Sequence, residues 1–286
     1  MDTMRDRFAD LHLHTTASDG TQGIAELARR AALLGLSTIA ITDHDTISPE
    51  LAGRVAWIEG VEVITGVEIK ADFDGVRGEL LGYFVDPGAT LLKGLFTFMQ
   101  QARRERMAQM VALCRERAGL DVTNDEVSAL AAGSIGRPHL AQLLVEKGAV
   151  RSTREAFDRL LAKGRPCYVS LDKPGFREAA EAIHAAGGVA SIAHPCLMDV
   201  KDWDEFLARV HAEGVDGVEA LYPYAVARGQ LHISPAALTA LARKEGFLLT
   251  GGSDDHGPGS VKESFGVLRI PLSYVDALRS ACGLAA

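Results

Sequence analysis

The chain of 286 residues has few cysteines, and they are widely separated, at Cys114, Cys167, Cys196 and Cys282. Such spacing excludes a disulfide framework and a zinc ribbon, which both need cysteines in closely spaced sets. The sequence also lacks an apolar run long enough to cross a membrane, and its first ten residues, MDTMRDRFAD, lack the apolar core of a signal peptide. We therefore expect a protein of the reducing cytoplasm that does not bind membranes.

Positive charge is in deficit as well. Lys and Arg number 30 against 38 Asp and Glu, which makes the formal net charge −8. Because neutralising many phosphates requires an excess of Lys and Arg, a broad nucleic-acid-binding surface is disfavoured. A small phosphorylated ligand in a local basic pocket stays compatible with this balance. The sequence has no internal repeats, no low-complexity segment and no GxSxG motif.

Short apolar runs rich in β-branched residues alternate with amphipathic helical patterns along most of the chain. The predicted strands cover residues 9–14, 37–42, 62–69, 79–85, 188–193, 217–222 and 248–252. Helical patterns at 23–35 and 176–188 end in glycine, the usual residue just past the end of a helix. A third helical pattern begins after Ser234, which is a suitable N-cap. This alternation predicts an α/β protein with a parallel sheet, either closed as a barrel or left open.

One region departs from the alternation. From about residue 95 to residue 163 the patterns are helical, and Thr123 and Ser152 each begin a capping box. We interpret the arginines of the first helix as a solvated face: Arg103, Arg104, Arg106, Arg115 and Arg117. The sequence thus predicts a barrel domain formed by residues 1–94 and 166–286, and a helical insertion, 95–165, that caps the substrate at one end of the sheet.

The histidines and acids gather where the predicted strands end. Five of the nine histidines lie at or just after such ends: His12, His14, His44, His194 and His256. His184, His211 and His232 lie in or beside helical patterns, and we assign them structural or surface roles. Three or more acids share the strand-end positions, among them Asp19, Glu68 and Asp254.

Strand alternation places Asp10, His12 and His14 on one face of the first strand. In parallel α/β folds the carboxyl ends of the strands meet at one rim, so these side chains are expected to converge there. So many acids at close quarters would repel one another unless cations balance them. Mixed imidazole and carboxylate ligands suit Mn, Fe or Zn, and the number of carboxylates favours more than one ion.

These residues resemble the PHP (polymerase and histidinol phosphatase) family of metal-dependent phosphoesterases. The resemblance runs from residue 9 to about 257, interrupted by the insertion. It depends on HxH at 12–14, Asp19, TDH ending at His44, GVEI with Glu68, AHP with His194, and SDxH with Asp254 and His256. It implies a distorted (β/α)7 barrel, three metal sites and the hydrolysis of phosphoesters.

The resemblance also implies three ligand sets. The first metal would be bound by His12, His14, Glu68 and Asp254. Glu68 would bridge to a second metal, completed by His194 and residue 79, and the third would be bound by Asp19, His44 and His256. Catalysis is assigned to His194, Asp254 and His256. We expect Asp10, Asp43 and Asp45 to contact the metal-binding histidines and so to orient their rings.

Position 79 departs from the family pattern. The family often has histidine before LLGY, whereas this chain has Glu79. A glutamate can still bind a metal, but it adds negative charge and favours a harder metal such as Mn over Zn; a weaker second site is the alternative. We therefore expect two or three Mn ions, with Fe or Zn as alternatives.

The sequence of the insertion indicates a particular class of substrate. Its GSIGRPH motif (133–139), followed by the stretch AFDRLLAKGRPCYV, is similar to the PHP subgroup that contains 3′,5′-nucleoside bisphosphate phosphatases and a 5′→3′ exoribonuclease. The motif offers backbone amides near a helix start, together with Ser134, Arg137 and His139, as a cradle for an anion. A second phosphate is expected to bind near the basic residues that follow: Lys163, Arg165 and Arg177.

The sequence thus predicts a phosphatase that removes the 3′-phosphate of nucleoside 3′,5′-bisphosphates, such as 3′-phosphoadenosine 5′-phosphate, and leaves the 5′-monophosphate. In this prediction a metal-bridging hydroxide attacks phosphorus, and no serine or cysteine nucleophile is needed. Three alternatives stay open: a 5′→3′ exonuclease acting on short RNA or DNA oligonucleotides, a non-catalytic metal-binding regulatory domain, and a C–N hydrolase. The expected partner is a small phosphorylated nucleotide, and the oligomeric state stays open.

Overall fold

A computed structural model describes residues 8–131, 134–227, 229–260 and 262–285. The chain divides into two compact units, the first made of Met1–Leu95 with Pro174–Ala286 and the second of Phe96–Lys173. The second unit continues beyond residue 165, where the predicted insertion ends, because Cys167 is buried in its core. No helix in these described ranges is both long enough and apolar enough to cross a membrane.

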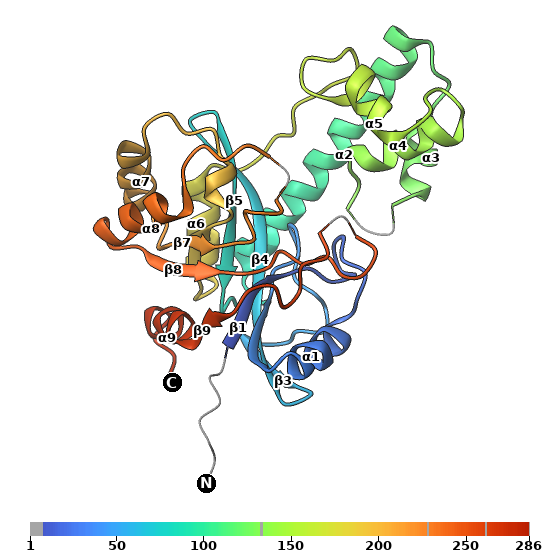
Figure 1. The fold of residues 1–286 in the computed structure, drawn as a ribbon. Helices are drawn as coiled ribbons and strands as arrows, with labels where there is room; N and C mark the ends of the chain where they lie inside the picture. Colours follow the sequence, from blue (N-terminus) through green and yellow to red (C-terminus); the bar gives the residue numbers. More distant parts are fainter. Residues whose placement is uncertain (1–7, 132–133, 228, 261, 286) are drawn as a thin grey trace. The chain divides into compact units, whose positions relative to one another are not determined.

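The first unit is built on one sheet, which has nine strands in the described residues. They are β1 (Phe8–Leu13), β2 (Leu36–Ile41), β3 (Val55–Ile58), β4 (Val61–Phe73), β5 (Val76–Tyr83), β6 (Val189–Ile192), β7 (Gly217–Leu221), β8 (Leu248–Gly251) and β9 (Ile270–Pro271). Their order is β8-β7-β6-β5-β4-β2-β1-β9, and β3 pairs with β4 (Figure 1).

The sheet nearly closes into a barrel, because β1 also bonds to the segment that follows β8. The backbone amide of His14 donates to the carbonyl of Asp255 at 3.0 Å, and that of Asp254 donates to the carbonyl of His12 at 2.9 Å. Gly252 permits this approach, since a Cβ there would overlap the backbone of His12. The predicted α/β barrel and all seven predicted strands are confirmed.

One strand runs against the predicted direction. β5 is antiparallel to both β4 and β6, whereas β1, β2 and β4 are mutually parallel. The cause is the two-residue turn Asp74-Gly75, whose φ angles of 47° and 81° suit a tight hairpin. The hairpin register sets Glu79 directly opposite Lys70. Glu79 therefore reaches the site from an antiparallel strand.

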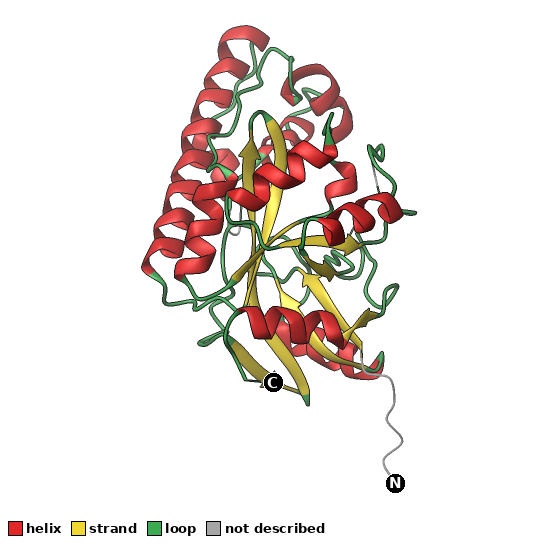
Figure 2. Ribbon diagram, turned by 90° about the vertical axis from the view of Figure 1, so that its left-hand side faces the viewer, coloured by secondary structure: helices red, strands yellow, loops and turns green. Residues whose placement is uncertain are grey.

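Helices flank the sheet of the first unit (Figure 2, helices red and strands yellow). They are α1 (Ile24–Leu33), α6 (Phe176–Ala185), the short 3₁₀ turn η2 (Pro195–Leu197), α7 (Trp203–Ala212), α8 (Pro235–Lys244) and α9 (Leu272–Ala281). The helices predicted at 23–35, 176–188 and after Ser234 are confirmed as α1, α6 and α8. The Ser234 hydroxyl accepts from the amide of Ala237 at 3.2 Å and caps α8. Ile24 and Leu27 of α1 pack against Ile39 in one buried cluster.

The second unit is helical in its described residues. It contains most of α2 (Thr90–Ala118), then α3 (Asn124–Ala129), α4 (Arg137–Glu146), α5 (Thr153–Ala156) and the π-helix η1 (Phe157–Leu161). Met110 and Cys114 of α2 pack with Leu140 and Leu144 of α4 to form its core. Thr123 completes the predicted capping box with Glu126.

The arginines of α2 do not form one uniform solvated face. Arg104, Arg115 and Arg117 are exposed, as predicted. For Arg103 and Arg106 the prediction is wrong, because both are half-buried. The Nε of Arg106 donates to the carbonyl of Val169 at 2.8 Å, and its guanidinium lies 5.8 Å from the ring centroid of Tyr168. Helical periodicity alone does not show this contact, because Tyr168 lies far along the chain.

Candidate metal centre

The nine candidate metal ligands of the sequence analysis all lie in the first unit. Three stand on strands, His12 on β1, Glu68 on β4 and Glu79 on β5, and His14 lies just past the end of β1. The other five lie in segments that follow strands: Asp19, His44, His194, Asp254 and His256. Eight of the nine gather in three groups whose donor atoms lie within 4.8 Å of one another: His12, His14, Glu68 and Asp254; His14, Asp19, His44 and His256; and His44, Glu68 and Glu79.

The group of His12, His14, Glu68 and Asp254 is wholly buried. His14 Nε2 lies 3.2 Å from Asp254 Oδ1 and 3.4 Å from Glu68 Oε2, and His12 Nε2 lies 3.5 Å from each of these oxygens. Among the described residues, none of these four atoms forms a hydrogen bond of normal geometry, although Glu68 Oε2 also lies 2.9 Å from His44 Nδ1. Buried polar atoms without partners are costly, and one cation between them would satisfy all four. The donor set therefore fits a metal ion.

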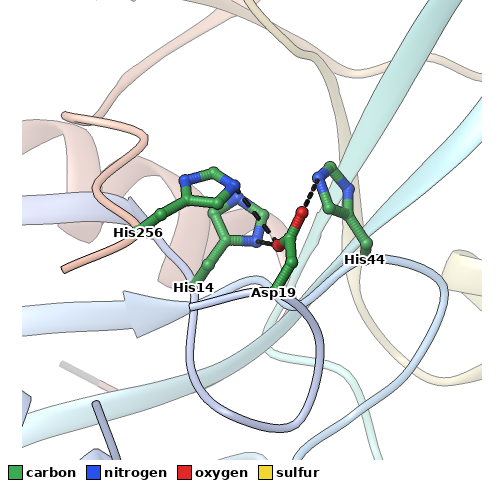
Figure 3. A group of neighbouring side chains, drawn as sticks. All are labelled: His14, Asp19, His44 and His256. Carbon is green, nitrogen blue, oxygen red and sulfur yellow. Dashed lines mark ion pairs between the residues drawn. The ribbon is translucent and has the colours of Figure 1, made fainter. Parts of the chain in front are cut away.

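The group of His14, Asp19, His44 and His256 is more open, because the Asp19 side chain is 57% exposed. Figure 3 shows the three imidazoles around its carboxylate. Asp19 Oδ1 lies 3.3 Å from His256 Nε2 and 3.9 Å from His14 Nδ1, and Oδ2 lies 3.8 Å from His44 Nε2. Most of these separations exceed hydrogen-bond length, so the group has the spacing of ligands around a small cation.

Glu79 joins the cluster through two histidines. His194 Nε2 lies 3.3 Å from Glu79 Oε2 and 3.1 Å from Glu68 Oε1, and His44 Nδ1 lies 2.9 Å from Glu68 Oε2 and 3.9 Å from Glu79 Oε1. The resemblance assigns His44 to the third metal, but His44 also lies close to Glu68 and Glu79, the implied ligands of the second metal. Lys70 Nζ lies 2.5 Å from Glu79 Oε1, and the sequence analysis did not anticipate this lysine.

Two of the candidate ligands have strained backbones. His194 and Asp254 have φ angles of 32° and 55°, in the left-handed region that residues other than glycine rarely adopt. Such a conformation costs about 1–3 kcal/mol for each residue and persists where the surrounding contacts impose it. The fold therefore holds both side chains in place against this cost.

Burial and carboxylates shift the pKa values of neighbouring histidines in opposite directions. Burial, followed by the charge of His44, lowers the pKa of His14 to about 3, so His14 is neutral and able to bind a metal. Burial alone would lower the pKa of His12 too, but the carboxylates of Glu219 and Asp254 outweigh it and raise that pKa well above its usual range. The carboxylates thus favour a positive charge at this place, and a metal cation would supply one.

The residue that orients His12 is Glu219, which the sequence analysis missed. Glu219 is fully buried on β7; its Oε1 lies 2.9 Å from His12 Nδ1, and its Oε2 accepts from the backbone amide of His194 at 2.7 Å. The sequence signal was present, since an acid in the apolar strand GVEAL needs a partner.

Two of the three aspartates assigned to this orienting role, Asp10 and Asp43, bond to backbone amides and hydroxyls. Asp10 accepts from the amides of Ser253 and His12 (2.8 and 3.3 Å), and Asp45 accepts from the amide of Lys70 (3.1 Å). Asp43 accepts from the hydroxyls of Thr15 and Ser18 (2.7 and 2.6 Å). The prediction that Asp10 and Asp43 orient imidazole rings is wrong, because these hydrogen bonds order the loops that carry the candidate ligands.

We expect Glu219→Gln to weaken Mn²⁺ binding by about 10- to 100-fold, the usual effect of losing a residue that orients a metal ligand. The amide has one acceptor atom, so it cannot serve both His12 and the amide of His194. Calorimetric titration with Mn²⁺ measures the affinity, and Glu205→Gln, a change on the exposed face of α7, is the matched control. Equal affinity in both variants would show that Glu219 does not support the ligands.

The predicted substrate contacts are distributed over both units. Ser134 and Lys163 are exposed in the second unit, and Gly133 of the same motif lies outside the described residues. His139 Nδ1 accepts from the amide of Gly136 at 3.0 Å and so caps α4. Arg137 lies 5.5 and 5.9 Å from the ring centroids of Phe157 and Tyr168.

Arg165 is exposed in the second unit. Arg177 of α6, in the first unit, pairs with Glu213 at 3.7 Å. None of these contacts tests binding of a phosphate, so the substrate-binding roles stay predictions.

Comparison with known proteins decides the family. The model of the PHP domain matches residues 10–169 of this chain. The chain belongs to the PHP family. The matched range includes six of the nine candidate ligands. The protein is accordingly a metal-dependent hydrolase of phosphoesters, and the regulatory alternative is not supported.

Two curated relatives and one solved structure illustrate the similarity. This PHP protein is 37% identical over 213 residues to a 5′-3′ exoribonuclease of Haemophilus influenzae, covering 73% of this chain and 77% of that protein. It is 32% identical over 262 residues to the 3′,5′-nucleoside bisphosphate phosphatase of Chromobacterium violaceum, covering 87% of each. A structure from Bifidobacterium adolescentis, described as a predicted metal-dependent phosphoesterase, matches with a TM-score of 0.76 and 30% identity over 96% of each chain.

Proposed function

We propose that this PHP phosphoesterase removes the 3′-phosphate from nucleoside 3′,5′-bisphosphates and releases the 5′-monophosphate. The observation that carries the proposal is the set of buried donor atoms of His12, His14, Glu68 and Asp254, which lack partners among the described residues. The name of the Chromobacterium violaceum relative supports the choice of substrate. Mn, bound as two or three ions, is the proposed metal, because carboxylates and imidazoles are mixed in the cluster.

Bound cations would lower the pKa of a water molecule and stabilise charge on the transferring phosphoryl group. The protein holds the ligands rigidly: Asp254 accepts from the Tyr222 hydroxyl at 2.9 Å and pairs with Lys262 at 2.5 Å through Oδ2, so Oδ1 faces the histidines. We assign the contacts nearest the substrate to His194 and His256, whose side chains are 14% and 9% exposed, while His12 and His14 are fully buried.

Two guanidiniums of the second unit are the proposed ligands of a substrate phosphate. Arg106 and Arg137 both lie over the ring of Tyr168, at 5.8 and 5.9 Å. Burial, followed by the charge of Arg137, lowers the pKa of Arg106 to about 10. Guanidiniums bind phosphate through bidentate hydrogen bonds. Ser134, His139, Lys163 and Arg177 are the further substrate contacts that we propose.

The test is phosphate release from 3′-phosphoadenosine 5′-phosphate in the presence of Mn²⁺. We expect kcat/KM at least about 100-fold above that for p-nitrophenyl phosphate, because a site that binds two phosphates discriminates against a substrate with one. Chromatography of the product should show adenosine 5′-monophosphate and no adenosine 3′-monophosphate. Equal kcat/KM values for the two substrates would discard the bisphosphate assignment.

A 5′→3′ exonuclease is the second candidate, favoured by the name of the Haemophilus influenzae relative. A short RNA or DNA oligonucleotide carrying a 5′-phosphate distinguishes the two, since a strict phosphomonoesterase cannot cut its phosphodiesters. Stepwise release of 5′-mononucleotides at a rate above that for the bisphosphate would make the exonuclease the main activity. The net charge of −8 disfavours long substrates.

A further inference from the structure

Lys70 lies inside the group of His44, Glu68 and Glu79. It stands directly opposite Glu79 in the antiparallel ladder of β4 and β5. Its Nζ is 2.5 Å from Glu79 Oε1 and 3.4 Å from His44 Nδ1. Its side chain is 31% exposed and that of Glu79 20%, so both are largely shielded from water. A positive charge therefore already stands among three side chains that could hold a cation.

The three groups differ in whether their donor atoms are satisfied. In the group around Asp254 the metal-facing atoms lack partners within the described ranges. Glu79, in contrast, has one oxygen hydrogen-bonded: its Oε1 accepts from the ammonium of Lys70 at 2.5 Å, while its Oε2 lies 3.3 Å from His194 Nε2. The oxygen that Lys70 takes is the one that lies 3.9 Å from His44 Nδ1.

Lys262 provides the comparison within the same cluster. It also pairs with a candidate ligand, Asp254, at 2.5 Å, but it takes Oδ2. The other oxygen, Oδ1, stays directed at His12 and His14. Lys262 thus leaves the Asp254 oxygen that faces the histidines open to a cation, whereas Lys70 occupies Oε1, the Glu79 oxygen that lies nearer to His44.

We propose that the ammonium of Lys70 takes the place of a metal ion in the group of His44, Glu68 and Glu79. The protein then holds two metal cations, one in each of the other two groups. The ammonium of Lys70, on β4, supplies the third positive charge. The inference rests on the proposed metal-dependent function. A divalent ion bound at Glu79 would have to displace Lys70 or lie next to its like charge, and both are unfavourable.

The experiment counts Mn²⁺ ions in the full-length protein and in Lys70→Met, which keeps the aliphatic stem and removes the charge. After equilibration with Mn²⁺ and removal of free metal, mass spectrometry of the digested protein gives the stoichiometry, and calorimetry gives the affinities. We expect two ions in the natural protein and three in Lys70→Met, with the weakest site tightened by about 10- to 100-fold. Lys244→Met, which removes an exposed lysine paired with Asp204, is the control and should keep two ions.

The outcomes separate this inference from the proposed function. Three ions in the natural protein, or unchanged stoichiometry and affinity in Lys70→Met, would overturn the inference and leave the proposed function intact. A lower melting temperature with unchanged metal content would assign Lys70 a purely structural role. No bound transition metal in either protein would overturn both. If Lys70→Met does not fold, anomalous scattering from Mn²⁺ in crystals of the natural protein decides: a peak beside Glu79 contradicts the inference, and peaks only at the other two groups support it.

Discussion

Replacing Glu68 with Gln is expected to lower kcat for phosphate release by about 1,000-fold or more, because losing several kcal/mol of charge stabilisation costs tenfold for each 1.4 kcal/mol. Glu68 belongs to two of the three donor groups. Its Oε2 lies 2.9 to 3.5 Å from His44, His14 and His12, and its Oε1 lies 3.1 Å from His194. An amide would bring no charge and would direct an N–H donor towards imidazoles or metal.

Steady-state kinetics with 3′-phosphoadenosine 5′-phosphate, together with the Mn²⁺ content of the variant, checks this prediction. Glu59→Gln is the control, because Glu59 pairs with Arg29 at 3.0 Å on the surface and should keep full activity. Circular dichroism shows whether both variants are folded. A folded Glu68→Gln protein with kcat within about tenfold of normal would contradict the assignment of Glu68 as a metal ligand.

Removing the metal is expected to abolish activity and to destabilise the fold. Without a cation, the atoms of His12, His14, Glu68 and Asp254 that face one another stay unsatisfied. A ligand present at 100 times its dissociation constant stabilises the native state by about 2.7 kcal/mol. The melting temperature should therefore fall by several degrees on chelation and recover when Mn²⁺ is added back.

Thermal unfolding and phosphate release, followed during chelation and after return of the metal, measure both effects. Chelator saturated with Mn²⁺ beforehand is the control, and it should change neither. The prediction would be wrong if protein shown to be free of transition metal kept its activity. A lost activity that Mn²⁺, Fe²⁺ and Zn²⁺ all fail to restore would instead point to irreversible unfolding, which circular dichroism detects.

Some of the site was accessible from local pattern alone. His12 and His14 lie two residues apart on a strand, so alternation puts them on one face, and both point at Glu68 and Asp254. His44, His194 and His256 follow strands, and the ends of parallel strands meet at one rim whatever the exact loops are. The resemblance to the PHP family then related these positions to metal-dependent phosphoester hydrolysis.

Sequence periodicity was sufficient for the alternating α/β architecture and for most candidate ligands, because strand and helix periods are local properties of the chain. The partners of those ligands needed the folded chain: Glu219 supports His12 across 207 residues, and no local pattern records such a pairing. The direction of β5 depended on the Asp74-Gly75 turn, and through it the contact between Lys70 and Glu79. The register of β4 and β5 decides whether Glu79 contacts a metal ion or the ammonium of Lys70, and only the tertiary structure specifies this register.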